Sequence, residues 1–255
     1  MTNWKLTLEY DGTEFSGWQI QANARTVQEE LERGLAQIAG SFVRVAGGGR
    51  TDTGVHATGQ VVSMELEKRF QPEALKRSLN GVLPYDIAVL GAEVADPDFH
   101  ARFSACARRY RYSIIQRPSA IGRHYSWMCF YPLDLTLLET CAARIIGEHD
   151  FMSFAKTGSE TEHGLCRVTE AHWTGTKDGL EFTITANRFL YGMVRALVGT
   201  MVDVARGYRQ PSDWTAIMEA RERQAAGAAA PAHGLCLLAI QYDGITSPRR
   251  QNVES

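Results

Sequence analysis

The sequence has no long apolar run, and this absence excludes one large class of proteins. No stretch approaches the ~20 consecutive apolar residues that a membrane-spanning helix needs. The first five residues, Met-Thr-Asn-Trp-Lys, also lack the basic segment followed by an apolar segment that marks a secretory signal. We therefore expect a cytoplasmic protein without a membrane anchor.

Cysteine is scarce and scattered along the chain. None of the 5 cysteines forms a Cys-x-x-Cys pair, and none has a histidine partner at the spacing of a zinc site. The pattern excludes a disulfide-stapled fold. It predicts reduced thiols in the core and no bound metal.

A positive charge excess is also missing. Lys and Arg number 27, Asp and Glu number 29, and the formal net charge is -2. Proteins that coat nucleic acid without specificity usually carry a strong positive excess, so the balance argues against that class. A nucleic-acid site on this chain must be a local feature.

The chain is long enough to bury a large core. It has 255 residues, of which 44% are hydrophobic and 22% are charged. These values are typical of a globular protein that forms one sizeable domain or two closely packed halves.

Strand-like and helical patterns occur in both halves of the chain. Strands are predicted at residues 4–10, 43–45, 61–66, 87–94, 109–115, 168–174, 180–186 and 235–242. Helices are predicted at residues 27–39, 72–79, 135–146 and 190–201, and the Ala- and Gly-rich residues 224–232 predict a mobile connection. We expect an α+β fold of two similar halves, residues 1–117 and 118–247, with a polar tail at 248–255. Each half is expected to be an antiparallel sheet with packed helices, and the substrate cleft is expected between them.

The loop at residues 47–60 concentrates residue types that catalysis uses. The three glycines at 47–49 lack Cβ atoms, so the backbone can approach a ligand closely or take a strained turn. Arg50 offers a guanidinium fork for phosphate or a base edge, and Asp52 offers a carboxylate that can act as nucleophile or base. The run matches neither a nucleotide triphosphate loop nor a dinucleotide fingerprint. A glycine-rich turn with a solvated aspartate is the plain alternative.

Residues 99–132 contain no acidic side chain and carry a cationic and aromatic stripe. Its members are Arg102, Arg108, Arg109, Arg111, Arg117 and Arg123, interleaved with Tyr110, Tyr112, Tyr125 and Trp127. Arginines can neutralise phosphates and aromatic rings can stack on an exposed base, which favours an RNA-binding cleft. A strand with a solvated arginine edge and core tyrosines is the alternative.

The motif Gly49-Arg50-Thr51-Asp52, followed by a Gly-Val-His-Ala run at 54–57, closely resembles the signature loop of the tRNA pseudouridine synthase A family. Further segments on both sides of this loop are similar to the family in order and spacing, and they extend over nearly the whole chain. They lie at residues 10–13, 15–19, 25–28, 99–105, 108–112, 147–151, 187–191, 193–195 and 230–235. The departures are few. Family members commonly have alanine where Gly48 and Thr53 stand, and often histidine where Gly192 stands.

The resemblance implies a tRNA-modifying isomerase with a pseudouridine synthase fold. It implies conversion of uridines at positions 38, 39 and 40 of the anticodon stem-loop to pseudouridine by a homodimer. Asp52 is then the catalytic nucleophile and Arg195 its cationic partner. Tyr110 is the ring that stacks on the extruded base, and Arg50 fills the gap that the base leaves.

This reaction breaks the N-glycosidic bond of uridine, rotates the base and rejoins it to the ribose through C5. Because there is no net redox change, the reaction requires no redox cofactor or metal. A carboxylate attacks the base or the sugar, and a second group takes the C5 proton. A glycoside hydrolase is one alternative, although that chemistry uses two carboxylates and this loop supplies one. A non-catalytic RNA-binding protein is the other, and it would not need Asp52.

Five further residues have weaker claims to a functional role. His56 either contacts RNA or satisfies a loop carbonyl, and Trp18 and Gln19 either line the cleft or pack it. Asp11 and Asp243 lie in similar Tyr-Asp-Gly turns and are expected to be turn residues.

Overall fold

The computed structural model describes residues 1–67, 70–158 and 163–242. The polar tail expected at 248–255 and the turn residue Asp243 lie outside this part of the chain. The described strands are β1 (Thr2–Tyr10), β2 (Ala46–Gly47), β3 (His56–Leu66), β4 (Ile87–Val94), β5 (Ala105–Ile115), β6 (Trp127–Met128), β7 (Gly147–Asp150), β8 (Leu165–Gly175), β9 (Gly179–Ala186) and β10 (Leu235–Tyr242). The described helices are α1 (Val27–Ala39), α2 (Pro72–Val82), α3 (Leu135–Ala143), α4 (Met193–Ala205) and α5 (Asp213–Ala220), with short 3-10 turns η1 (Gly122–His124), η2 (Met152–Phe154) and η3 (Ala232–Gly234).

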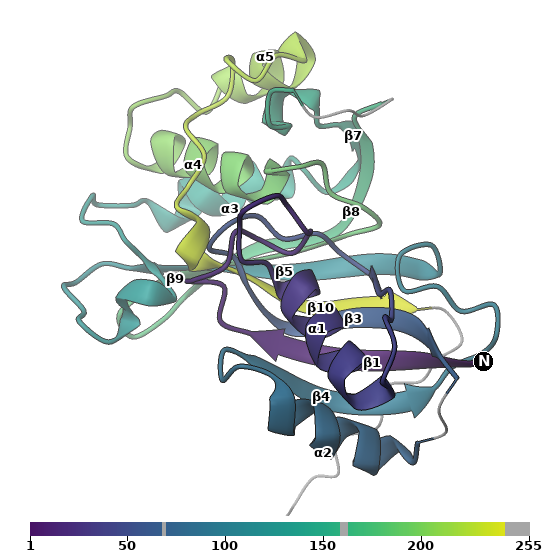
Figure 1. The fold of residues 1–255 in the computed structure, drawn as a ribbon. Coiled ribbons are helices and arrows are strands. Elements are labelled where there is room, and N and C mark those ends of the chain that lie inside the picture. Colours follow the sequence, from purple (N-terminus) through teal and green to yellow (C-terminus); the bar gives the residue numbers. More distant parts are fainter. Residues whose placement is uncertain (68–69, 159–162, 243–255) are drawn as a thin grey trace, which may run out of the picture.

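The ten strands of the described residues form one sheet, in the order β4-β1-β3-β10-β5-β9-β8-β7, with β2 paired to β3 and β6 to β5 (Figure 1). The expectation of two separate sheets was therefore wrong. The strands β4, β1 and β3 pair antiparallel, as do β5, β9, β8 and β7. Between these two blocks lies β10, which pairs parallel to β3 and antiparallel to β5. One strand thus joins two antiparallel sheets into a continuous one.

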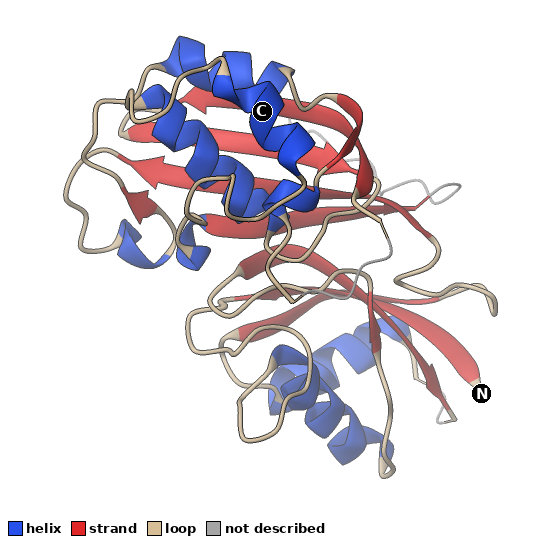
Figure 2. Ribbon diagram, turned by 90° about the horizontal axis from the view of Figure 1, so that it is seen from above, coloured by secondary structure: helices blue, strands red, loops and turns tan. Residues whose placement is uncertain are grey.

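The helices gather at the two ends of this sheet. Helices α1 and α2 lie with the block of β4, β1 and β3, while α3, α4 and α5 lie with β7, β8 and β9 (Figures 1 and 2). The fold is therefore mixed α+β, as the sequence predicts. No helix in the described ranges is long and apolar enough to cross a membrane.

Helix α1 shows how local sequence fixes an element. Its N-cap Thr26 accepts a hydrogen bond from the backbone N–H of Glu29, and it ends at Gly40, whose φ of 81° is left-handed. Val27, Leu31 and Leu35 recur at helical spacing and are fully buried. The predicted bounds are confirmed because both caps and the apolar stripe agree.

Residues 224–230 are packed against α4 rather than forming the loose connection that their composition suggested. The backbone N–H of Gly227 donates to the Thr200 hydroxyl at 2.9 Å. A Cβ on Gly199 would lie 1.8 Å from the carbonyl oxygen of Ala228, so only glycine permits this approach. Small residues on both sides therefore let a segment without regular structure lie directly on a helix.

Other differences concern element ends and short elements. Strand β3 begins at His56, five residues before the apolar run, because its first residues pair with β1 and β10. In place of the strand predicted at 43–45, the two-residue β2 follows at Ala46. Helix α3 ends at Ala143, three residues before the predicted end. Helix α5 was not predicted, because it buries only Trp214 and Ile217 and so has no long apolar stripe.

Candidate active site

The glycine loop between β2 and β3 is fixed by a second loop at residues 12–18. The backbone N–H of Trp18 donates to the Thr51 carbonyl at 3.1 Å, and the N–H of Gly54 donates to the Phe15 carbonyl at 3.2 Å. Gly17 has a φ of 92°, and a Cβ there would lie 2.7 Å from the Thr51 oxygen. The backbone around Asp52 therefore has a defined position before any substrate binds.

Buried polar side chains hold the same loop from the sheet. Gln60, which is fully buried, accepts from the Gly49 backbone N–H at 3.2 Å and donates to the Gly49 carbonyl at 2.7 Å. The Tyr10 hydroxyl lies 2.7 Å from the Thr51 hydroxyl. Because the residues on both sides of Arg50 are tied down, the exposed Arg50 side chain projects from a fixed base.

Asp52 and Arg195 meet although 143 positions separate them in the sequence. The distance from Arg195 Nη1 to Asp52 Oδ2 is 3.2 Å, and the two side chains are 24% and 14% exposed. Arg195 is itself held, because its Nε donates to the Ala230 carbonyl at 2.8 Å and its own carbonyl accepts from the Ala230 N–H at 2.9 Å. The guanidinium thus orients a carboxylate that keeps some access to solvent.

Tyr110 on β5 lies beside this pair and is 7% exposed. Its ring packs edge-on against Phe189 with centroids 5.1 Å apart, and its hydroxyl lies 3.8 Å from where a Cβ on Gly49 would be. Burial is the main cause that raises the pKa of Tyr110, and the nearby charge of Asp52 adds to it. The phenol is therefore neutral in this structure, so it can donate a hydrogen bond but is a poor base.

Arg108 is a structural centre of the site, and sequence reasoning placed it only among the stripe. Its guanidinium donates to four carbonyl oxygens, those of Gly48, Ala105, Arg102 and Asn187. Burial lowers the pKa of this guanidinium. Arg108 and Tyr110 lie two positions apart and so share one face of β5. This spacing in the sequence could have predicted that Arg108 lies on the same side of the strand as Tyr110.

The other arginines of the stripe differ in whether they pair with a carboxylate. Arg109 binds Glu170, Arg111 lies 3.7 Å from Glu181, and Arg117 binds Asp178 at 2.8 Å. These partners come from β8, β9 and the turn between them, so these three arginines belong to a charged sheet surface. Arg102 and Arg123 are exposed. Three of the six arginines of the stripe are therefore paired with carboxylates of the protein itself.

His56 joins the glycine loop to residues 122–126. Its Nε2 donates to the His124 carbonyl at 2.8 Å, and its Nδ1 accepts from the Gly12 N–H at 2.9 Å. Asp11 Oδ1 lies 3.2 Å from the same Nδ1, which forms an ion pair only if the ring is protonated. Tyr125 completes the contact, because its hydroxyl donates to Asp11 Oδ2 at 2.6 Å. We call these four side-chain contacts the loop latch.

The remaining sequence candidates have simple positions. Trp18 is buried and packs on Gly47, where a Cβ would come within 2.5 Å of the indole, so it packs the site rather than lining it. Gln19 is exposed. Gly192, where family members often have histidine, precedes α4 with a φ of 74°, a conformation that favours glycine. No group of three or more potential metal ligands occurs among the described residues.

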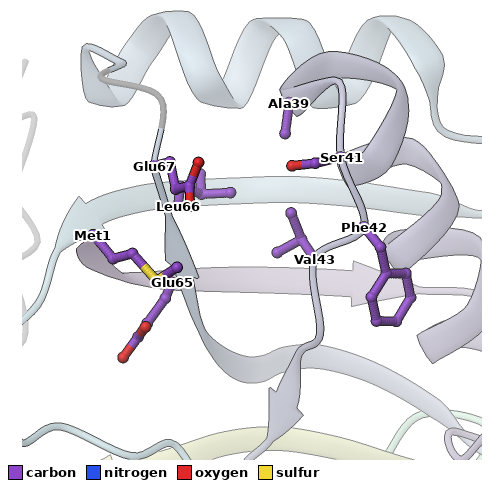
Figure 3. Close-up of a pocket in the computed structure, with 8 residues that line it drawn as sticks. All are labelled: Met1, Ala39, Ser41, Phe42, Val43, Glu65, Leu66 and Glu67. Atoms are coloured by element: carbon purple, nitrogen blue, oxygen red, sulfur yellow. The ribbon is translucent and has the colours of Figure 1, made fainter.

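A pocket of about 420 Å³ lies elsewhere, lined by Met1, Ala39, Ser41, Phe42, Val43, Glu65, Leu66 and Glu67 (Figure 3). None of the candidate catalytic residues lines it. Glu65 lies nine residues along β3 from His56, which corresponds to ~30 Å of extended strand. This pocket is therefore remote from the Asp52 site.

Comparison with known proteins gives consistent matches. A family model described as tRNA pseudouridine synthase matches residues 7–104 and 141–243, which include Asp52 and Arg195 respectively. The tRNA pseudouridine synthase A of Bacillus velezensis is 43% identical over 243 residues, covering 94% of this chain and 98% of its own length. The protein of that name from Bacillus subtilis gives the same figures. The one from Moorella thermoacetica is 42% identical over 242 residues, covering 93% of this chain and 98% of its own length.

Proposed function

Because the chain belongs to the tRNA pseudouridine synthase family, we propose that it isomerises uridines at positions 38, 39 and 40 of the tRNA anticodon stem-loop, with Asp52 as the nucleophile. The coarser activity follows from the family itself: the chain is an isomerase that converts uridine in tRNA to pseudouridine. This activity sets aside the two alternatives of glycoside hydrolysis and non-catalytic RNA binding.

The observation that carries the assignment of Asp52 is its 3.2 Å ion pair with Arg195. In the reaction, the bond between uracil N1 and ribose C1′ breaks, the base turns, and a bond forms between C5 and C1′. The C5 proton leaves and N1 gains a proton, so atoms and charge balance without an oxidant or reductant. A carboxylate that is already aimed and charge-compensated by a fixed arginine can attack the base or the sugar without first reorganising.

We propose that Arg50 and Tyr110 handle the extruded base. Arg50 is exposed at the tip of a loop whose flanking residues are fixed, which suits a side chain that occupies the space left in the RNA. Tyr110 lies beside Asp52 with a neutral phenol, which suits stacking on uracil and donation of a hydrogen bond to it. Tyr110 takes the C5 proton only if substrate binding lowers the pKa of its phenol.

The family resemblance also supports three broader proposals. We propose that the protein acts as a homodimer, that it works in the cytoplasm, and that it needs neither metal nor organic cofactor. Light scattering of the purified protein at micromolar concentration measures the first of these directly, and a monomeric mass for the active enzyme would contradict it.

The proposed activity is tested by release of tritium from tRNA transcripts labelled at uridine C5. We expect release by the unaltered protein, none by Asp52→Ala, and modification confined to positions 38, 39 and 40 when the product is mapped. Asp213→Ala is the matched control, because Asp213 is an exposed aspartate on α5, outside both the catalytic loop and residues 99–112.

Each result has one meaning. Full release by Asp52→Ala would remove Asp52 from the role of nucleophile. Release with modification at other positions would overturn the anticodon stem-loop assignment while leaving the isomerase activity intact.

A further inference from the structure

Two exposed side chains and a half-buried histidine lie between β4 and β5, and the mechanism does not use them. Phe103 is 76% exposed, and its ring centroid lies 4.4 Å from that of His100 with the planes 33° apart. The Arg102 guanidinium lies 5.6 Å from the Phe103 centroid. We call His100, Arg102 and Phe103 the aromatic rim. A single exposed phenylalanine is ordinary, but this one belongs to a turn that is held rigidly near the candidate active site.

The aromatic rim is held rigidly. His100 Nδ1 accepts from the backbone N–H groups of Arg102 and Phe103 at 3.1 and 3.3 Å, and the Ser104 N–H donates to the His100 carbonyl at 2.9 Å. Between them, Ala101 is fully buried, and its N–H donates to the Ser63 hydroxyl on β3. The Phe103 ring is therefore displayed from a fixed turn, so a ligand that stacks on it does not have to order the backbone first.

The aromatic rim also lies at the edge of the candidate active site. One nitrogen of Arg108, Nη2, donates to the carbonyls of Gly48 and Arg102, both at 2.9 Å. Gly48 is four residues before Asp52, which is at most ~14 Å of chain. A strand of RNA whose uridine reaches Asp52 therefore has neighbouring nucleotides within reach of Phe103.

We propose that the aromatic rim is a second RNA contact, in which Phe103 stacks on an unpaired base next to the target uridine and Arg102 binds a phosphate. Every base has a π-face, so an exposed ring accepts different bases, and a guanidinium pairs well with phosphate oxygens. This inference rests on the proposed function, because it takes tRNA as the ligand. It adds a binding element that is separate from Asp52, Arg195, Arg50 and Tyr110.

The chain supplies a matched control for this proposal. Phe42 is 66% exposed, and the Arg44 guanidinium lies 5.2 Å from its ring, so it repeats the Phe–Arg arrangement of the rim. It lines the remote pocket of Figure 3 rather than the active site. Phe42→Ala and Phe103→Ala therefore remove the same group from two different surfaces.

The experiment measures tRNA affinity, turnover and base stacking for the two variants and for Phe103→Trp. We expect Phe103→Ala to raise the Kd for tRNA about 5- to 150-fold with kcat within about twofold of the original. Phe103→Trp should restore affinity, and Phe42→Ala should change nothing. A 2-aminopurine placed next to the target uridine should be quenched by the unaltered protein and by Phe103→Trp, but not by Phe103→Ala.

Three outcomes would overturn the proposal. Unchanged affinity and quenching in Phe103→Ala would show that the ring does not touch RNA. A loss of kcat at unchanged Kd would mean that the rim positions the catalytic loop instead. A change of molecular mass in Phe103→Ala with unchanged affinity would mean that the rim is a contact between copies of the chain. If the unaltered protein releases no tritium from labelled tRNA, the proposed function fails, and the quenching result still decides whether Phe103 contacts RNA.

Discussion

Arg195 makes two contacts in different directions, and this property separates it from a simple positive charge. Its Nη1 reaches Asp52 and its Nε reaches the Ala230 carbonyl. A lysine keeps the charge but has one ammonium group, so it cannot serve both partners with the same geometry. For Arg195→Lys we expect kcat to fall about 10- to 150-fold, corresponding to ~1.5–3 kcal/mol for a hydrogen bond to a charged group.

Single-turnover rates with saturating enzyme measure this change without interference from product release. Arg206→Lys is the control. Arg206 directly follows α4 and binds Asp203 of that helix, so it does not contact Asp52. A rate for Arg195→Lys within twofold of the original would mean that charge alone suffices at this position.

Much of the candidate site was accessible from the sequence at this scale, but by two different routes. Asp52 and Arg50 stand out locally, since the glycine loop around them has no structural need for both groups. Arg195 and Tyr110 were assigned only through the family resemblance, because their patterns fit an ordinary apolar helix and an ordinary strand. Arg108 was not singled out, because two of the four carbonyls that it binds, those of Gly48 and Asn187, are 60 and 79 positions away in the sequence.

At the scale of elements, two helical glycines should respond to alanine in opposite directions. A Cβ on Gly199 of α4 would clash with the Ala228 carbonyl, whereas a Cβ on Gly81 of α2 would meet nothing within 4 Å. We expect Gly199→Ala to lower the free energy of unfolding by ~1–3 kcal/mol through overpacking. We expect Gly81→Ala to raise it by ~0.5–1 kcal/mol through helix propensity. Urea denaturation of both variants tests this, and equal effects would contradict the packing of residues 224–230 on α4.

The loop latch should show itself in the pH dependence of stability. Hydrogen bonds from Thr13 and Tyr125 lower the pKa of Asp11 below its ordinary 3.8, although partial burial opposes them. A lowered carboxyl pKa gives stability that is fully present above 3.8 and is lost as the pH falls through the folded value. In Tyr125→Phe we expect a higher Asp11 pKa and a smaller loss of stability on acidification. Carbon NMR of the Asp11 carboxyl measures the pKa, and an unchanged value would mean that Tyr125 contributes nothing.

Elements with local signals were predicted well, and elements defined by distant partners were not. The bounds predicted for α1, β4 and β10 match the structure, since caps and periodicity lie within each segment. The order of strands in the sheet has no such signal. Placement of β10 between β3 and β5 depends on pairing over more than a hundred residues, and local patterns carry no information about such pairing.

For the whole molecule, this topology predicts how the chain responds to division. A fragment of residues 1–117 would contain β3 and β5 without the strand that lies between them. We expect it to be unfolded or aggregated when expressed alone, because one edge of β3 and both edges of β5 lose their partner strands. Co-expression with residues 118–255 should give a soluble complex. Circular dichroism and light scattering are the measurements, and a folded monomer of 1–117 would mean that the halves are independent domains.

The late position of β10 in the chain has a consequence for protein synthesis. About 120 residues separate the end of β5 from the start of β10, and at ~5–20 residues per second the ribosome needs ~6–24 s to make them. During that interval the nascent chain already has β3 and β5, but not the strand that joins them. The Ala230 carbonyl that anchors Arg195 is also made only after β9, α4 and α5. Catalytic competence is therefore acquired only after residues 230–242 have been made, and a product that terminates before them has no assembled site with which to act on tRNA.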